Sequence, residues 1–211
     1  MHLSLKRPRA GIAAIALCAA VSVLPGQSQA TPVSGTEAVR SLYATLLSTM
    51  RNGAALGQRG RYATIAPVVR QNFDVDFMAK LAVGPGWASL SEPQRQVLTQ
   101  AFERYIAAVY AERFDSYAGE KLQVIGEQPS PGGAIVRSQI VKANGEPINI
   151  NYLVRQNGGS WQIADVYLNG TISELATRRA EFGAILKTQG VDGLIATLNR
   201  KADLLSAARS S

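Results

Sequence analysis

The sequence predicts an α+β fold, in which a run of helices is followed by antiparallel strands and then by a closing helical region. Apolar residues recur at helical spacing in the first part, whereas residues 121–168 alternate with a period of two. Two alternating runs, 148–155 and 161–168, flank the Asn-Gly-Gly sequence at 157–159, which tolerates positive φ and is typical of a hairpin. Helical spacing returns after Gly170, so the hairpin leads into a helix that lies back across the sheet. A sheet and a helix arranged in this way enclose an apolar space.

The first thirty residues have the pattern of a secretory signal peptide. Basic residues precede an apolar run at 10–24, and Ser-Gln-Ala at 28–30 supplies the small residues of a cleavage site after Ala30. The apolar run has about 15 residues, too few to span a bilayer comfortably; retention as an N-terminal anchor is the alternative. We therefore expect a signal peptide at 1–30, a linker at 31–35, a single domain at 36–204 and a flexible tail at 205–211.

Cysteine and histidine usage excludes several common classes of enzyme. The one cysteine, Cys18, and the one histidine, His2, both fall within the expected signal peptide. Without them the mature chain cannot build a Ser-His-Asp or Cys-His nucleophile, a zinc site of the usual nitrogen and sulfur type, or a disulfide. We therefore expect no metal and no cofactor, and a fold held together by packing alone. Enzymes that use only carboxylates, lysine or tyrosine stay possible.

The charge balance of the mature chain is only mildly basic. Removing the three basic residues of the signal peptide from the 22 Lys and Arg leaves 19 against 15 Asp and Glu, a net charge of +4. Such an excess favours encounter with anionic membrane surfaces or head groups, but it is far from the charge of a nucleic-acid-binding protein. Ordinary solubility is the favoured explanation of this excess.

The first predicted helix covers residues 36–50, whose apolar residues recur at i, i+3, i+4 and i+7. Ser34 or Thr36 is expected to cap its start, and Asn52 and Gly53 are expected to end it. This helix therefore has one face for the core.

Two short helices and a forced break are predicted next. After a polar turn at 57–60, residues 61–83 read as two short helices, the second capped by Asp74. Gly-Pro-Gly-Trp at 84–87 breaks the chain and places Trp87 on a loop.

A long helix follows, beginning with a capping box formed by Ser91 and Gln94. Its apolar face, from Val97 to Phe114, is wide. Such a face commonly packs on a sheet and on another helix at once, so it requires no ligand.

Four strands are predicted after Lys121, at residues 122–125, 134–142, 148–155 and 161–168. The turns between them lie at 129–133, 144–147 and 156–160 and are rich in Gly, Pro, Asn and Ser. Connections this short predict an antiparallel meander.

Several short motifs, in their order and spacing, resemble one protein family. They are Phe73-Asp74 with Met78, the spacing of Gly84 and Trp87, the helix start Ser91-Glu92-Pro93-Gln94-Arg95, and Trp161-Gln162-Ile163-Ala164-Asp165-Val166 leading into Gly170 and Ser173. The chain resembles the MlaC family, also called toluene-tolerance proteins, over roughly residues 36–201. These proteins are soluble periplasmic phospholipid carriers that serve an ABC lipid transporter.

The resemblance implies a curved four- to five-stranded sheet, similar to NTF2-like domains, that encloses a hydrophobic lipid pocket. It also implies a monomeric periplasmic shuttle with no enzymatic activity, whose partners are an inner-membrane ABC transporter complex and an outer-membrane lipoprotein complex. The sequence departs from the family pattern at residues 170–173, which carry an extra residue, and the form Thr171-Ile172-Ser173-Glu174-Leu175-Ala176 looks more like the branch encoded with hopanoid biosynthesis. The lipid expected from the resemblance is a phospholipid, a hopanoid, or both.

The candidate lipid-binding residues are aromatic and aliphatic side chains on the predicted helix and sheet faces, together with Trp87 on its loop, although each position would fill a core equally well without a ligand. They are Phe77, Leu81, Trp87, Phe102, Tyr105, Ile106, Val109, Val136, Ile140, Tyr152, Val154, Val166, Ile172 and Phe182. Arg178 and Arg179, beside the junction of sheet and helix, are the candidates for contact with a partner or a lipid head group.

Asp165 lies in an apolar stretch of its strand and needs a cationic or hydrogen-bonding partner, because an unpaired buried carboxylate is costly. Arg178 or Arg179 is the expected partner. The alternative function is an NTF2-like small-molecule binder or enzyme that uses Asp165 and tyrosines in the same cavity.

Overall fold

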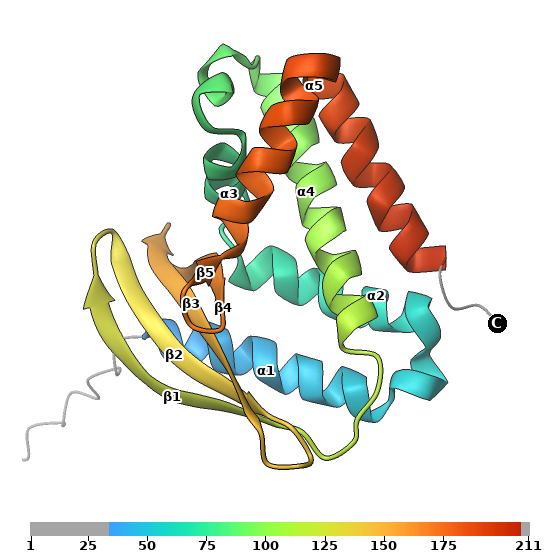
Figure 1. The fold of residues 1–211 in the computed structure, drawn as a ribbon, viewed down its shortest axis with the longest axis vertical. Coiled ribbons are helices and arrows are strands. Elements are labelled where there is room, and N and C mark those ends of the chain that lie inside the picture. The colour runs from blue at the N-terminus through green and yellow to red at the C-terminus, as the bar shows by residue number, and fades with distance from the viewer. Residues whose placement is uncertain (1–33, 208–211) are drawn as a thin grey trace, which may run out of the picture. The chain divides into compact units, whose positions relative to one another are not determined.

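A computed structural model describes residues 34–207. The expected signal peptide, linker residues 31–33 and tail residues 208–211 lie outside the described residues. The elements, in chain order, are α1 Gly35–Arg51, α2 Gly53–Asn72, α3 Val75–Val83, the 3₁₀ helix η1 Gly84–Ser89, α4 Glu92–Arg113, β1 Lys121–Ser130, β2 Gly133–Val141, β3 Pro147–Asn157, β4 Ser160–Leu168, β5 Ile172–Ser173 and α5 Glu174–Ala207 (Figure 1). This order confirms the predicted α+β class.

The strands form one antiparallel sheet in the order β1-β2-β3-β4-β5. The predicted meander is therefore confirmed, and β5 is an additional two-residue strand that pairs with the end of β4. The sheet curves around α1, which contacts all four long strands (Figure 1). Register shifts between Val124 and Gly126, and between Leu153 and Val154, add local bends of the kind that β-bulges produce.

Helix α1 is held to the sheet at its first turn. Ser34 occupies the N-cap position, but its side chain makes no capping hydrogen bond to the helix. Instead, the Thr36 amide donates to the Glu127 carboxylate of β1, at 2.9 Å. A carboxylate at this end also complements the helix dipole. Asn52 ends the helix, as predicted.

Helices α2 and α3 differ from the prediction in one place. The turn expected at 57–60 is confirmed only at its first residue: the chain kinks at Gly57, with φ 59° and ψ −179°, whereas residues 58–60 are already helical within α2. Asp74 caps α3 as predicted, accepting a hydrogen bond from the Phe77 amide at 3.1 Å. The break at 84–87 is the start of η1 and not an open loop.

The capping box of Ser91 and Gln94 opens α4 as predicted. Near its other end, α4 is tied to α2 by Arg61, a guanidinium that is only 5% exposed. Arg61 donates to the Ala111 carbonyl at 2.9 Å, to the Gly53 carbonyl at 3.0 Å and to the Gln58 side-chain oxygen at 2.6 Å. Three acceptors compensate the loss of hydration of this buried charge.

Helix α5 consists of two helical segments joined at Gly190, which has φ 69° and ψ −171°. Its second segment runs back beside α4 and continues to Ala207, so residues 205–207 of the expected tail are helical. Ile172, counted with the helical spacing in the sequence, instead lies in β5 and is 52% exposed.

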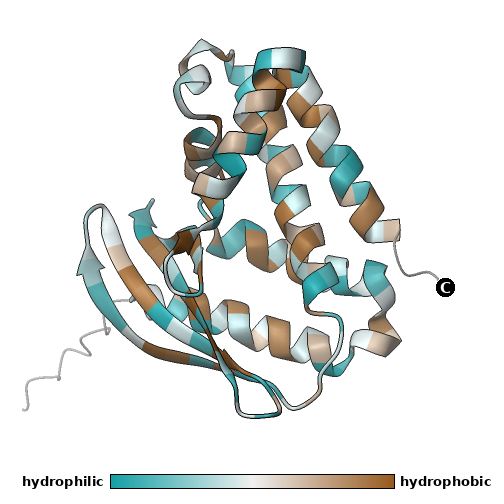
Figure 2. Ribbon diagram, viewed as in Figure 1, coloured by the Kyte–Doolittle hydropathy of each residue, from teal (hydrophilic) through white to brown (hydrophobic). Residues whose placement is uncertain are grey.

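One hydrophobic core joins the helices to the sheet. Hydrophobic residues recur along α1, α4 and the strands (Figure 2). Val97, included in the predicted apolar face of α4, is 47% exposed and stays outside this core. No helix within residues 34–207 combines the length and hydrophobicity that a membrane-spanning segment requires.

Candidate functional site

A cavity of about 240 Å³ lies between α4 and the inner face of the sheet, and is partly open to solvent. A single water needs about 10–15 Å³ by the same kind of measure, so this space is far larger than a packing defect. Its walls come from α4, from β2, β3 and β4, and from the first turns of α5, with Phe73 and Met78 closing one side.

Seven of the lipid-binding candidates line this cavity. They are Phe102, Tyr105, Ile106, Val109, Ile140, Tyr152 and Val166. Other apolar lining residues were not among the candidates: Phe73, Met78, Tyr110, Phe114, Ile148, Ile150, Leu168 and Leu175. The combined lining is predominantly aliphatic and aromatic, which suits a hydrocarbon ligand.

Seven other candidates do not line the cavity. Val136 and Val154 are completely buried in the core. Phe182 packs edge-on against Phe102, with ring centroids 5.7 Å apart, and therefore supports the cavity wall from behind. Their lipid-binding role stays a prediction.

The remaining four lie at the surface or against other side chains. Phe77 lies under the Arg155 guanidinium, 4.3 Å from its ring centroid, and Trp87 lies similarly under Arg95 at 5.7 Å. Leu81 is 40% exposed and Ile172 is the exposed residue of β5. A lipid-binding role for these four also stays a prediction.

Two tyrosines of the cavity lining, Tyr110 and Tyr152, form a cluster with Tyr43, which lies outside the lining. Burial raises the pKa of the Tyr152 hydroxyl well above its ordinary value, and the neighbouring Tyr110 and Tyr43 raise it further. Burial also raises the pKa of Tyr110, although the charge of Arg113 opposes this rise. Tyr43 shares a 2.6 Å hydrogen bond with Ser138, which also bonds a backbone carbonyl. These hydroxyls are therefore neutral, and hydrogen bonds among them satisfy their polar groups.

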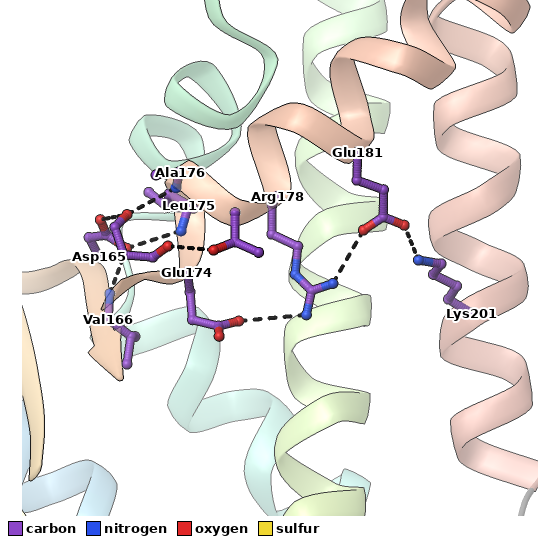
Figure 3. Close-up of polar contacts among 10 residues, drawn as sticks. Asp165, Val166, Glu174, Leu175, Ala176, Arg178, Glu181 and Lys201 are labelled. Atoms are coloured by element: carbon purple, nitrogen blue, oxygen red, sulfur yellow. Dashed lines mark hydrogen bonds and ion pairs between the residues drawn. The ribbon is translucent and has the colours of Figure 1, made fainter. Parts of the chain in front are cut away.

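Three charged side chains line the cavity, namely Arg113 at the end of α4 and Glu174 and Arg178 on α5. Arg178 lies 3.6 Å from Glu174 and 3.3 Å from Glu181 (Figure 3). Its guanidinium lies over the Tyr105 ring, 5.5 Å from the ring centroid. Lys201, from the second segment of α5, forms an ion pair with Glu181. The acidic residues thus compensate Arg178 from both sides.

Asp165 does not pair with Arg178 or Arg179, so that expectation was wrong. Its carboxylate accepts hydrogen bonds from the Ser173 hydroxyl at 2.5 Å and from the Leu175 amide at 3.3 Å (Figure 3). A third bond comes from the Val166 amide at 2.7 Å. Burial nevertheless raises the pKa of Asp165 above its ordinary value. Donors at the start of α5 therefore satisfy this carboxylate without a cation.

Arg179 is exposed, and its guanidinium lies over the Gly84 turn, where an added Cβ would be 2.9 Å from the Arg179 Nε. Among residues 34–207, no carboxylate forms an ion pair with it. A role for Arg179 in contacting a partner stays a prediction.

The arrangement suits binding better than catalysis. Asp165, the carboxylate of the alternative enzyme hypothesis, does not line the cavity, and Glu174, which does, is paired with Arg178. Within the described part of the chain, no three Asp, Glu, His or Cys side chains gather in a way that would hold a metal ion. The site offers an apolar chamber with charge confined to part of its lining.

Comparisons with known proteins agree with this geometry. The sequence model of one family, described as MlaC protein, matches residues 40–200. Among solved structures, the phospholipid-binding protein from Ralstonia solanacearum, determined in complex with a phospholipid, is similar with a TM-score of 0.70 and 18% sequence identity. The match covers 82% of this chain and 99% of that one. At this identity the likeness establishes the fold, including its curved antiparallel sheet.

Proposed function

This chain belongs to the MlaC family, and from that membership we propose that it binds phospholipid and carries it across the periplasm. In this proposal it shuttles between an inner-membrane ABC transporter complex and an outer-membrane lipoprotein complex, as a monomer and without enzymatic activity. The observation that carries the proposal is the apolar cavity of about 240 Å³ between α4 and the sheet. The phospholipid bound by the similar Ralstonia protein supports the choice of ligand.

The energy of burying a lipid tail explains why such a protein needs docking partners. Burying one methylene contributes about 0.8 kcal/mol, so a chain of about 16 carbons contributes on the order of 10 kcal/mol. Release of a lipid into water is therefore very slow. Transfer requires a partner that offers an apolar path at the cavity mouth, so the carrier must dock directly on its membrane complexes.

The central test is to identify the lipid that copurifies with the mature protein. Native mass spectrometry gives the number of bound molecules, and organic extraction followed by mass spectrometry gives their class. Recovery of phospholipid supports the proposal. Recovery of a hopanoid instead would assign the ligand suggested by residues 170–176. A protein that stays empty after exposure to both lipids would favour a small-molecule binder.

The periplasmic location rests on the sequence pattern of residues 1–30 and is tested separately. Fractionation should place the mature protein in the periplasm, and N-terminal sequencing should begin at Thr31. Membrane-bound mature protein that retains residues 10–24 would instead identify an anchored carrier.

A further inference from the structure

The charged residues of the cavity all lie on helices, whereas the sheet side of the lining is apolar. Arg113 comes from α4, and Glu174 and Arg178 come from α5. Across from them, β2 and β3 contribute the half-buried Ile140 and Ile148, which pair with each other in the sheet. The polar end of an amphipathic ligand therefore fits the helix side of the cavity, and its apolar part fits the sheet side.

Arg178 is poorly suited to hold a ligand anion because its charge is already compensated. Glu174 and Glu181 lie on either side of its guanidinium, and its face covers Tyr105. An incoming anion would have to compete with two carboxylates and would meet their repulsion. The same pairing neutralises Glu174, so this carboxylate repels a nearby anion less than a free one would.

Arg113 has the opposite surroundings. It is exposed in the last turn of α4 while still lining the cavity, and no carboxylate within residues 34–207 forms an ion pair with it. Its neighbour Phe114 stacks on Tyr110, with ring centroids 5.7 Å apart, and both rings also line the cavity. Arg113 thus places a solvent-facing positive charge beside the aromatic wall of the cavity.

We propose that Arg113 binds the phosphate of the bound lipid and so sets the orientation of the cargo, with its tails against the apolar lining and its head group at the C-terminal end of α4. Guanidinium suits this task because its planar donors match the oxygens of a phosphate ester. The inference rests on the proposed function, and it adds a residue that discriminates phospholipid from a neutral lipid with the same tails.

The test compares two lipids that differ only at the head group, phosphatidylglycerol and diacylglycerol with identical chains. Delipidated protein is incubated with vesicles of a neutral, phosphate-free glycolipid, digalactosyldiacylglycerol, that contain one test lipid, and the bound test lipid is counted by native mass spectrometry. Arg113→Gln should lower phosphatidylglycerol recovery by about two- to fivefold, the range expected for a solvent-facing charge contact. Diacylglycerol recovery should not change. Arg113→Lys should restore part of the difference.

Arg137 supplies the matched control, because it is exposed on the outer face of β2, away from the cavity lining, and Arg137→Gln removes the same charge. This variant should retain both lipids as the wild type does. Equal phosphatidylglycerol recovery by Arg113→Gln and Arg137→Gln would overturn the inference while leaving lipid binding intact. Wild-type protein that takes up neither lipid would overturn the proposed function as well.

A further experiment distinguishes binding of a lipid phosphate from binding of a soluble phosphate ester. Glycerophosphoglycerol, the deacylated head group of phosphatidylglycerol, carries the same phosphate diester without tails, and calorimetry with the wild type should show no binding at concentrations at which the lipid saturates the protein. Binding of this probe that is lost in Arg113→Gln would assign the site to a soluble phosphate ester and overturn the lipid assignment.

Discussion

Asp165 and Glu181 are two carboxylates whose surroundings shift the pKa in opposite directions. Burial raises the pKa of Asp165, even though the Ser173 hydroxyl and two amides donate to it. Burial also acts to raise the pKa of Glu181, but hydrogen bonds and charges from Lys201 and Arg178 outweigh it and lower the pKa. A raised folded-state pKa contributes stability at low pH that is lost as pH rises through it, and a lowered pKa does the reverse.

The first prediction concerns how the free energy of unfolding depends on pH when Asp165 or Glu181 is replaced by its amide, in Asp165→Asn and Glu181→Gln. The free energy of unfolding of the wild type, relative to Asp165→Asn, should fall as pH rises from about 3 to 7, because only the wild type must ionise a buried group. Relative to Glu181→Gln it should rise over the same window, because the ion pairs form as Glu181 ionises. Urea unfolding at several pH values measures both differences in the free energy of unfolding. If the two differences changed in the same direction with pH, the opposite pKa shifts of Asp165 and Glu181 would be contradicted.

Helix α5 depends on one glycine for its change of direction. Gly190 has φ 69° and ψ −171°, a combination that other residues adopt only with strain. Gly183 lies in the same helix, with nothing within 4 Å of an added Cβ. The two positions therefore respond oppositely to the same substitution.

The second prediction is that Gly190→Ala lowers the free energy of unfolding by about 1–3 kcal/mol, the cost of holding alanine in that conformation. Gly183→Ala should raise it by about 0.5–1 kcal/mol, because alanine loses less backbone entropy in a helix. Thermal and urea unfolding followed by circular dichroism compare the two. If Gly190→Ala matched Gly183→Ala in stability, the glycine conformation would not be what determines the kink.

At the scale of the whole molecule, inward-facing residues are of two kinds: some line the cavity, and others are fully packed in the core. Val109 lines the cavity, whereas Val154 is completely buried outside it. A Cβ added at Gly35 would lie 2.3 Å from a Val154 methyl, so the space beside Val154 is already occupied.

The third prediction is that Val109→Trp fills the cavity and lowers lipid recovery several-fold, while the protein still unfolds cooperatively. Val154→Trp should destabilise the fold by about 3 kcal/mol or more, because an overpacked core must rearrange. Extracted lipid per mole of protein and the midpoint of urea unfolding give the two readouts. Unchanged lipid content in a folded Val109→Trp variant would place the ligand elsewhere.

The fourth prediction concerns docking on partner complexes. Arg179 is exposed and, among the described residues, has no carboxylate partner, whereas Arg178 is held by Glu174 and Glu181. Arg179→Glu should slow lipid transfer between liposomes that carry the two complexes, with unchanged stability. Arg178→Glu should lower stability, because it places three acidic side chains together. Normal transfer by Arg179→Glu would remove this residue from the docking surface.

Much of the fold follows from local signals in the sequence. The caps at Asp74 and Ser91 and the glycine-rich hairpin at 157–159 each depend on neighbouring residues, and all three appear in the structure. The kink at Gly190 was not predicted, because helical spacing continues on both sides of it. The strand β5 is too short for any period to reveal.

The cavity is only partly predictable because periodicity identifies an inward face but not the gaps in its packing. Val109 and Val154 both belong to inward faces, yet only Val109 lines empty space. Arg113 was missed for a related reason, since a basic residue near the end of a helix is usually explained by the helix dipole. The role of such a charged side chain depends on which residues the fold brings next to it, as Ser173 and Leu175 do for Asp165.

Arg61 has a consequence for how the helical layer opens. Its buried guanidinium needs the carbonyls of Gly53 and Ala111 at the same time, although these lie at the start of α2 and near the end of α4. Fraying of either helix end would leave a desolvated charge with an unmatched donor, which costs more than an ordinary hydrogen bond. The two ends are therefore expected to unfold together, and hydrogen exchange of their backbone amides should give the same free energy of opening.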